Sequence, residues 1–146
     1  MQMNTLVEQV AREWIGTPYL HQASVVGVGC DCIGLVRGVW RTVFGEEPEA
    51  FKPYSSAWSE ITGEERLMNA AHRNLNIKPN RILQPGNVVL FRMRRNSVSK
   101  HIGILGSPTT VIHAYEGNCV VETSLTDFWS KRITGVFEFP VKGKSV

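Results

Sequence analysis

Apolar side chains recur at helical spacing in the first half of the chain. One run predicts a helix over about residues 5–15. A second run begins at Cys32, has Asp31 as its expected N-cap and ends at Gly45. The apolar positions of these two runs are Leu6, Val10, Trp14, Leu35, Val36, Val39, Trp40 and Val43.

The pattern changes after residue 45. Residues 46–62 contain two prolines and adjacent serines, which is typical of a long surface loop, and a third short helix is predicted around residues 67–75. Short β-branched or aromatic runs then alternate with turn residues, which predicts a meandering antiparallel sheet. These runs are residues 87–93, 101–106, 110–115, 119–124 and 133–140. Helices followed by strands predict an α+β fold, with N-terminal helices packed on the sheet.

Length and composition favour one folded domain over residues 1–146, with a core of about 5–140 and a loose tail. The 16 Lys and Arg residues against 13 Asp and Glu give a scattered net charge of +3, so we expect no nucleic-acid partner. The N-terminus shows no signal-peptide pattern and no segment could span a bilayer, so we expect synthesis in the cytoplasm, no membrane insertion and another delivery route.

Three cysteines occur, Cys30, Cys32 and Cys119, and an odd, sparse set argues against a disulfide scaffold. Cys32 would be the first residue of the second helix, where unpaired N–H groups and the helix dipole favour a thiolate. We therefore expect its pKa to fall toward the range of reactive cysteines. The alternative is a buried, inert thiol, which is common for free cysteine.

Two of the four histidines lie on neighbouring predicted strands, whereas His21 and His72 are expected to be solvated or satisfied by local hydrogen bonds. If the turn at residues 107–109 pairs Leu105 with Val111, Gly103 faces His113 and His101 lies diagonally beside it, about 7–8 Å away by backbone position. The two rings can then meet. A register slip of one residue would place them on opposite faces of the sheet.

A thiolate, a base and a group that orients the base form the general arrangement for nucleophilic cysteine catalysis of acyl transfer. Around these residues a set of short motifs occurs in a fixed order and resembles the NlpC family of papain-like cell-wall cysteine peptidases over about residues 11–115. The motifs are Gly16-Thr17-Pro18-Tyr19, Gly29-Cys30-Asp31-Cys32-Ile33-Gly34-Leu35, Leu83-Gln84-Pro85-Gly86-Asn87, His101-Ile102-Gly103-Ile104 and Ile112-His113-Ala114.

The resemblance implies a papain-like fold and assigns Cys32 as nucleophile, His101 as base and His113 as the residue that orients the base. Tyr19 would lie beside the thiol and help bind the substrate or the oxyanion. The implied substrate is a peptidoglycan stem peptide, cut at an amide bond that in this family often joins D-γ-glutamate to a diamino acid. Neither a cofactor nor a metal is expected.

The sequence departs from the family's common pattern. Asn87 replaces a common aspartate, and Ile33 replaces a common serine, which affects stem-peptide preference, while Asp31 remains available to meet a substrate cation. The runs 19–24 and 30–40 look most like the branch found in phage tails and gene transfer agents. That likeness implies tail-like protein partners and a virion- or tail-associated enzyme that acts on the cell wall.

Two other interpretations stay open. Cys30 and Cys32 with one or two histidines could form a zinc site, although this spacing is unusual for structural zinc. A non-catalytic tail or wall-binding module could instead use the basic residues Arg92, Arg94, Arg95 and Lys100 on anionic wall polymers. A solvated hairpin edge is the simpler explanation of those residues.

Overall fold

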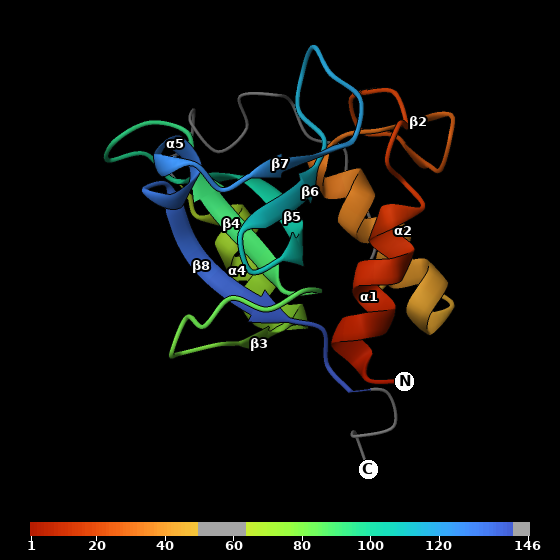
Figure 1. Ribbon diagram of the computed structural model, residues 1–146, viewed down its shortest axis with the longest axis horizontal. Helices are drawn as coiled ribbons and strands as arrows, with labels where there is room; N and C mark the ends of the chain where they lie inside the picture. Colours follow the sequence, from red (N-terminus) through yellow and green to blue (C-terminus); the bar gives the residue numbers. More distant parts are fainter. Residues whose placement is uncertain (50–63, 142–146) are drawn as a thin grey trace.

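The computed structural model describes residues 1–49 and 64–141, and it combines helices with a six-stranded antiparallel sheet (Figure 1). Its helices are α1 (Met3–Arg12), α2 (Cys32–Phe44), α4 (Arg66–Asn74) and α5 (Asp127–Ser130). The main sheet contains β3 (Asn76–Ile77), β4 (Val88–Arg92), β5 (Ser99–Ser107), β6 (Thr110–His113), β7 (Val121–Ser124) and β8 (Ile133–Glu138). A small hairpin of β1 (Ser24–Val25) and β2 (Gly29–Cys30) precedes α2.

The three predicted helices and five predicted strands are present, with shifted ends, whereas the short elements α5, β1, β2 and β3 were not predicted. The prediction of a simple meander is wrong for the last strand. The sheet order is β3-β8-β4-β5-β6-β7, so β8 crosses to the far edge and pairs with β4 instead of following β7. The cause is the burial of β4: Val88 to Phe91 are fully buried, so the backbone groups along both edges of the strand need hydrogen-bond partners, which β5 and β8 supply.

Helix α2 begins and ends as the sequence predicted. The Asp31 side chain accepts a hydrogen bond from the Gly34 N–H at 2.7 Å, and Gly45 ends the helix with a positive φ of 95°. Helix α1 packs closely on α2 because Gly38 has no side chain: a Cβ there would overlap the Trp14 ring.

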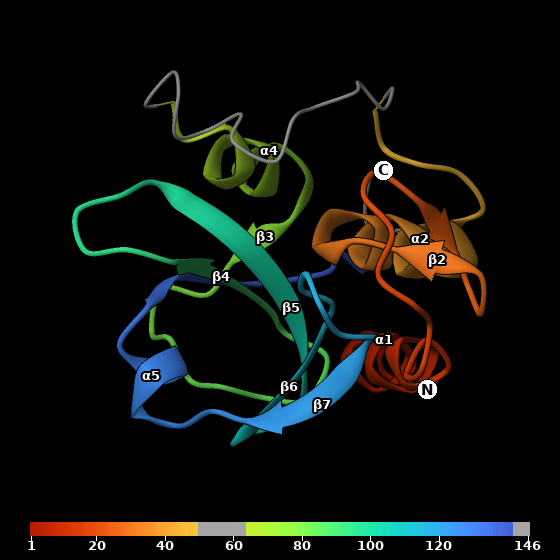
Figure 2. The same cartoon turned by 90° about the horizontal axis from the view of Figure 1, so that it is seen from above.

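Hydrophobic residues pack on both faces of the sheet. On one face α1, α2 and α4 cover alternate residues of β4 and β5, including Leu90 and Ile104. On the other face Phe91, Leu105 and Val111 pack beneath the segment that contains α5. Figure 2 shows α5 on the side of the sheet away from α1 and α2. Two separate layers therefore meet the strands that carry the two histidines.

Two expectations concern segments that are described only in part. The predicted surface loop 46–62 lies outside the described residues from residue 50 onward, and the predicted tail lies outside them from residue 142. In the described part of the chain, no helix has the length and apolar character needed to cross a bilayer.

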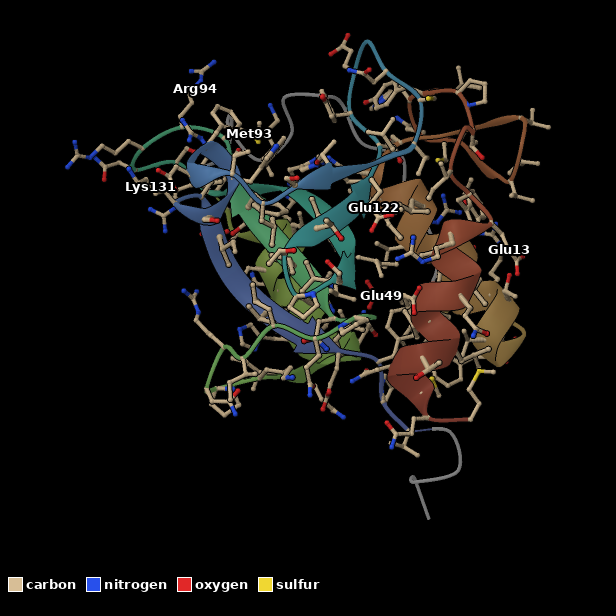
Figure 3. The ribbon with its side chains drawn as sticks, in the orientation of Figure 1. Glu13, Glu49, Met93, Arg94, Glu122 and Lys131 are labelled. Carbon is tan, nitrogen blue, oxygen red and sulfur yellow. The ribbon has the colours of Figure 1, made fainter. Side chains whose placement is uncertain are left out.

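A polar network joins α1 to the sheet. Arg12 donates to Glu122 at 2.7 Å and to the Gly106 carbonyl at 2.8 Å, while the Thr110 hydroxyl donates to Glu122 at 2.7 Å. These two donors lower the pKa of Glu122. Figure 3 shows Glu122 between the sheet and the helices, whereas Glu13 points away from them.

Glu122→Gln is expected to lower the free energy of unfolding by about 1 kcal/mol at pH 7, a modest value because solvent screens both partly exposed partners. A lowered folded-state pKa means that the stabilisation is fully present above about pH 4.5 and is lost as the pH falls through the folded-state value. Urea unfolding at pH 7 and pH 3 checks this, with Glu13→Gln as the matched control. An equally large difference at pH 3 would contradict the ionic explanation.

Candidate active site

The two histidines meet as the predicted register requires. Leu105 pairs with Val111 and Ile104 with Ile112, which confirms the register and places both imidazoles on one face. His101 Nε2 lies 2.8 Å from His113 Nδ1, within hydrogen-bond distance. Both rings are buried, with exposed fractions of 5% and 0%. The fold has therefore formed a buried imidazole pair from strands β5 and β6.

A third residue, which sequence reasoning missed, continues this pair. His113 Nε2 lies 2.9 Å from the Thr123 hydroxyl on β7. When His101 Nε2–H donates to His113 Nδ1, His113 carries its own proton on Nε2 and can donate it to Thr123. The sequence contained a signal for Thr123, because side chains alternate between the two faces along the next predicted strand. Val111 pairs with Thr123 across β6 and β7, which places Thr123 on the same face as His113. The relay His101–His113–Thr123 fixes the orientation of the first imidazole.

Cys32 is the first residue of α2 and faces strand β5. The backbone N–H groups of Ile102, Ile33 and Cys32 itself favour the thiolate form of the sulfur, so the thiol lies close to β5. Ile102 follows His101 in the chain, and His101 Nδ1 is the ring nitrogen that His113 does not engage. Cys32 is half-buried as a residue.

The expectation that the helix start lowers the thiol pKa is wrong for this structure. Burial, with a smaller contribution from the Asp31 charge, raises the pKa of Cys32 to about 12, and the backbone donors only partly oppose this. Burial also lowers the pKa of His101 to about 3, assisted by the charge of His113, and that of His113 to about 4. Without substrate, the site holds a neutral thiol beside neutral imidazoles.

Tyr19 lies where the resemblance placed it, beside the nucleophile. Its backbone pairs with that of Cys30, and its side chain is half-buried. Burial, followed by the charges of Cys32 and Asp31, raises the pKa of Tyr19 to about 12. The phenol is therefore a neutral O–H donor at physiological pH, suited to a developing negative charge near the sulfur.

Asp31 differs from the expectation that it remains available for a substrate cation. One carboxylate oxygen accepts from the Gly34 N–H, and the other accepts from the Gln22 N–H at 2.7 Å and lies 3.7 Å from His21 Nδ1. The residue is only 2% exposed. Asp31 instead ties the loop after Tyr19 to the start of α2, because its carboxylate accepts a hydrogen bond from an N–H group of each.

The same loop is held to α2 by backbone contacts. The Asp31 N–H donates to the Ala23 carbonyl at 3.3 Å, and the Ser24 hydroxyl donates to the Gly34 carbonyl at 2.5 Å. Gly34 permits this approach, since a Cβ there would overlap the Ala23 oxygen. The loop that carries Tyr19 is thus positioned by the helix that carries Cys32.

The zinc interpretation gains no support from the described residues. Cys30 is buried in β2, while Cys119 lies partly exposed opposite Pro18. Among residues 1–49 and 64–141, no three His, Cys, Asp or Glu side chains are grouped so that they could hold a metal ion.

Comparison with protein families identifies the family of the chain. The model of the NlpC/P60 family matches residues 16–138, so the chain belongs to the NlpC/P60 family. The match contains Tyr19, Cys32, His101, His113 and Thr123. No curated protein matches the chain.

Solved structures share the fold at low sequence identity. The NlpC/p60 domain of the peptidoglycan hydrolase SagA has a TM-score of 0.62 and 18% identity, over 93% of this chain and 98% of that one. An NlpC/P60 family protein from Bacillus cereus ATCC 10987 has a TM-score of 0.66 and 17% identity, over 94% of this chain. A lipoprotein-like member from Staphylococcus aureus Mu50 has a TM-score of 0.62 and 15% identity, over 95% of this chain. These likenesses confirm the α+β, papain-like fold.

The lengths of the neighbours differ from that of this chain. It spans 42% of the Staphylococcus protein and 40% of the Bacillus protein, but nearly all of the SagA domain. The correspondence is therefore with one domain of the longer proteins.

Proposed function

We propose that the protein is a cysteine peptidase that hydrolyses amide bonds in peptidoglycan stem peptides. The observation that carries the proposal is the buried His101–His113–Thr123 relay, whose strand β5 contacts the helix that begins at Cys32. Membership of the NlpC/P60 family supports it, as does a structural neighbour described as a peptidoglycan hydrolase. A buried nucleophile, a base and residues that orient the base are the parts that acyl transfer needs.

In the first half of the reaction, the Cys32 proton moves to His101 Nδ1 as the sulfur attacks the amide carbonyl carbon. Burial disfavours both a free Cys32 thiolate and a free His101 imidazolium, so both groups are neutral before the reaction. The proton therefore moves at the same time as the sulfur attacks. His113 accepts the Nε2–H bond of the imidazolium, and the Tyr19 hydroxyl and the Cys32 N–H donate to the oxyanion. The C–N bond then breaks, and His101 returns the proton to the leaving amine.

In the second half, water hydrolyses the thioester. His101, neutral again, takes a proton from the water that attacks the acyl carbon, and the same donors stabilise the second oxyanion. Collapse releases the carboxylic acid product, which loses its proton to solvent, and the proton on His101 returns to the Cys32 sulfur. The cycle consumes one amide bond and one water, and no cofactor takes part in it.

The finer proposals concern the bond cut and the route of delivery. The bond between D-γ-glutamate and a diamino acid is the one that family resemblance favours, and Ile33 and the engaged Asp31 alter the surroundings of the thiol. The runs 19–24 and 30–40 support a role in a phage tail or gene transfer agent, in contact with tail proteins and acting on the wall. Immunoblots of purified particles test that role, and particles that lack the protein would refute it.

A second candidate function, binding of anionic wall polymers, is favoured by the charge distribution. None of the 13 acidic residues lies between residues 66 and 115, a stretch that holds eight Lys and Arg residues. Arg94, Arg95 and Lys131 are exposed, and Figure 3 shows Arg94 and Lys131 at the same end of the molecule. Such a basic surface would hold the enzyme on its substrate, or would act without catalysis.

Digestion of purified sacculi separates the two functions. The wild-type protein is expected to release muropeptides with new amine ends, which mass spectrometry assigns to one bond. Cys32→Ala is expected to release none, because no other group can form the acyl intermediate. Both proteins should sediment with sacculi equally if the basic surface contributes binding.

Two outcomes would decide against the peptidase. Wild-type protein that sediments with sacculi but yields no new amine end would leave the binding function. Digestion that survives Cys32→Ala would assign the chemistry to another group.

A further inference from the structure

A tryptophan that the proposed mechanism does not use lies against both imidazoles. Trp129, in the short helix α5, has its ring centre 5.5 Å from that of His101 and 4.9 Å from that of His113. It also contacts Phe91 at 5.2 Å and Tyr115 at 6.0 Å. The Trp129 indole therefore contacts both histidines from α5, an element separate from the strands β5 and β6 that carry them.

The position of Trp129 follows from the topology of the sheet. Helix α5 lies between β7 and β8, on the face of the sheet away from α1 and α2 (Figure 2). Cys32, in α2, packs against the hydrophobic cluster on the α2 face of the sheet, whereas Trp129 packs with Phe91 and Leu105 on the other face. Trp129 is itself half-buried. Its ring thus separates the imidazole pair from solvent on the side opposite the nucleophile.

We propose that Trp129 is a positioning residue for the reaction: its indole covers the His101–His113 pair, excludes water from the hydrogen bond between them, and holds His101 in the orientation that serves Cys32. This inference rests on the proposed function. It adds a residue from α5, outside the strands that carry the histidines.

Exclusion of water is the first physical effect. The 2.8 Å contact between His101 Nε2 and His113 Nδ1 keeps its full strength only where water cannot compete for either nitrogen. Burial also keeps both imidazoles neutral, since it lowers the pKa of His101 to about 3 and that of His113 to about 4. A neutral His113 is required, because a proton on Nδ1 would remove its acceptor.

Charge stabilisation is the second effect. His101 becomes positive for part of each turnover, and the planes of its ring and of the indole are only 33° apart. A cation near the face of an indole is attracted by the negative charge density of that face. The Trp129 indole therefore has two effects on His101. It keeps the resting imidazole neutral by burying it, and it stabilises the imidazolium that forms during turnover.

Other titratable groups also surround the pair and enter any pH profile. The Cys32 thiol lies near the backbone of Ile102, the residue after His101, and the Tyr115 ring follows β6 and contacts both imidazoles. On the α5 side, Asp127 begins the helix, and the Arg132 guanidinium lies 3.8 Å from the centre of the Phe128 ring. A variant at residue 129 leaves all of these groups in the sequence.

Replacing Trp129 by leucine tests the proposal without a substrate. NMR titration of the imidazole protons should show the pKa values of His101 and His113 rising toward 6.5, by about one unit or more, as water reaches the rings. Because protonation of a histidine blocks its role, the acidic limb of the digestion profile should move to higher pH by a similar amount. Trp129→Phe keeps an aromatic cover and should stay close to wild type in both measurements.

Phe128→Leu is the matched control, since Phe128 lies on the same helix and contacts Trp129 but has no ring contact with either histidine. A folded Trp129→Leu protein whose titrations match wild type would overturn the inference, as would Leu and Phe variants that behave alike. If Trp129→Leu does not fold, Trp129→Phe provides the test. In this variant, pKa values of His101 and His113 that rise to those of solvent-exposed histidines would contradict the inference, because an aromatic ring would still be present. If the histidine pKa values shift as expected in Trp129→Leu but the wild-type protein digests no sacculi, the proposed peptidase function is rejected and the cover by Trp129 is retained.

Discussion

His101→Ala is expected to slow the digestion of sacculi by about 10³-fold or more, because it removes the group that accepts the thiol proton and returns it to the leaving amine. The loss should be large because the pKa of Cys32 is raised to about 12, so few thiolates exist at neutral pH without a base. The residual rate should rise about tenfold per pH unit between pH 6 and 9, as hydroxide replaces the missing base. The wild-type rate should stay nearly flat there, since a histidine with a pKa of about 3 is already neutral.

Initial rates of muropeptide release, together with alkylation of Cys32 by iodoacetamide, measure this prediction. Alkylation needs no substrate and should show the same steep pH dependence in the variant. His72→Ala is the matched control, because His72 is exposed on α4 and its ring contacts Phe137 instead of the imidazole pair. A flat pH profile in the His101 variant would show that another group takes the proton.

His113→Leu is expected to lower the rate of digestion by about 5- to 150-fold, with little change in KM. The substitution leaves the buried Nε2–H of His101 without an acceptor, which costs about 1–3 kcal/mol. If this cost falls on the transition state, it corresponds to a rate loss of about 5- to 150-fold. His113→Asn retains an acceptor on a shorter side chain and should recover part of the loss. The kcat and KM for a soluble muropeptide distinguish this effect from weaker substrate binding.

The order of effects along the relay gives a sharper test. Thr123→Val removes the hydroxyl that contacts His113 while keeping the side-chain shape, and it should cost only about 2- to 12-fold, the value of one ordinary hydrogen bond. The losses should therefore fall in the order His101, His113, Thr123. A Thr123 variant as impaired as His113→Leu would contradict the view that each residue acts through the preceding one.

Much of the site could be predicted because its parts depend on local sequence. The Asp31 cap and the helix start at Cys32 follow from neighbouring residues, and the contact of His101 with His113 follows from a short turn that fixes the strand register. Thr123 was within reach of the same reasoning applied to one further strand. The rest could not be predicted in this way: Trp129 reaches the histidines through a short helix that has no periodic signal, and β8 pairs with a strand over 40 residues away in the sequence.

The sequence by itself determined the α+β class, the three helices, the start of the nucleophile helix and the residues that form the imidazole pair. These follow from interactions between residues near one another in the chain, which periodicity, capping and turn geometry express. Only the tertiary structure decided the charge state of the site, the engagement of Asp31 and the indole cover over the histidines. Burial is a property of the assembled fold, and here it outweighs the helix start, raising the pKa of Cys32 to about 12 and lowering that of His101 to about 3.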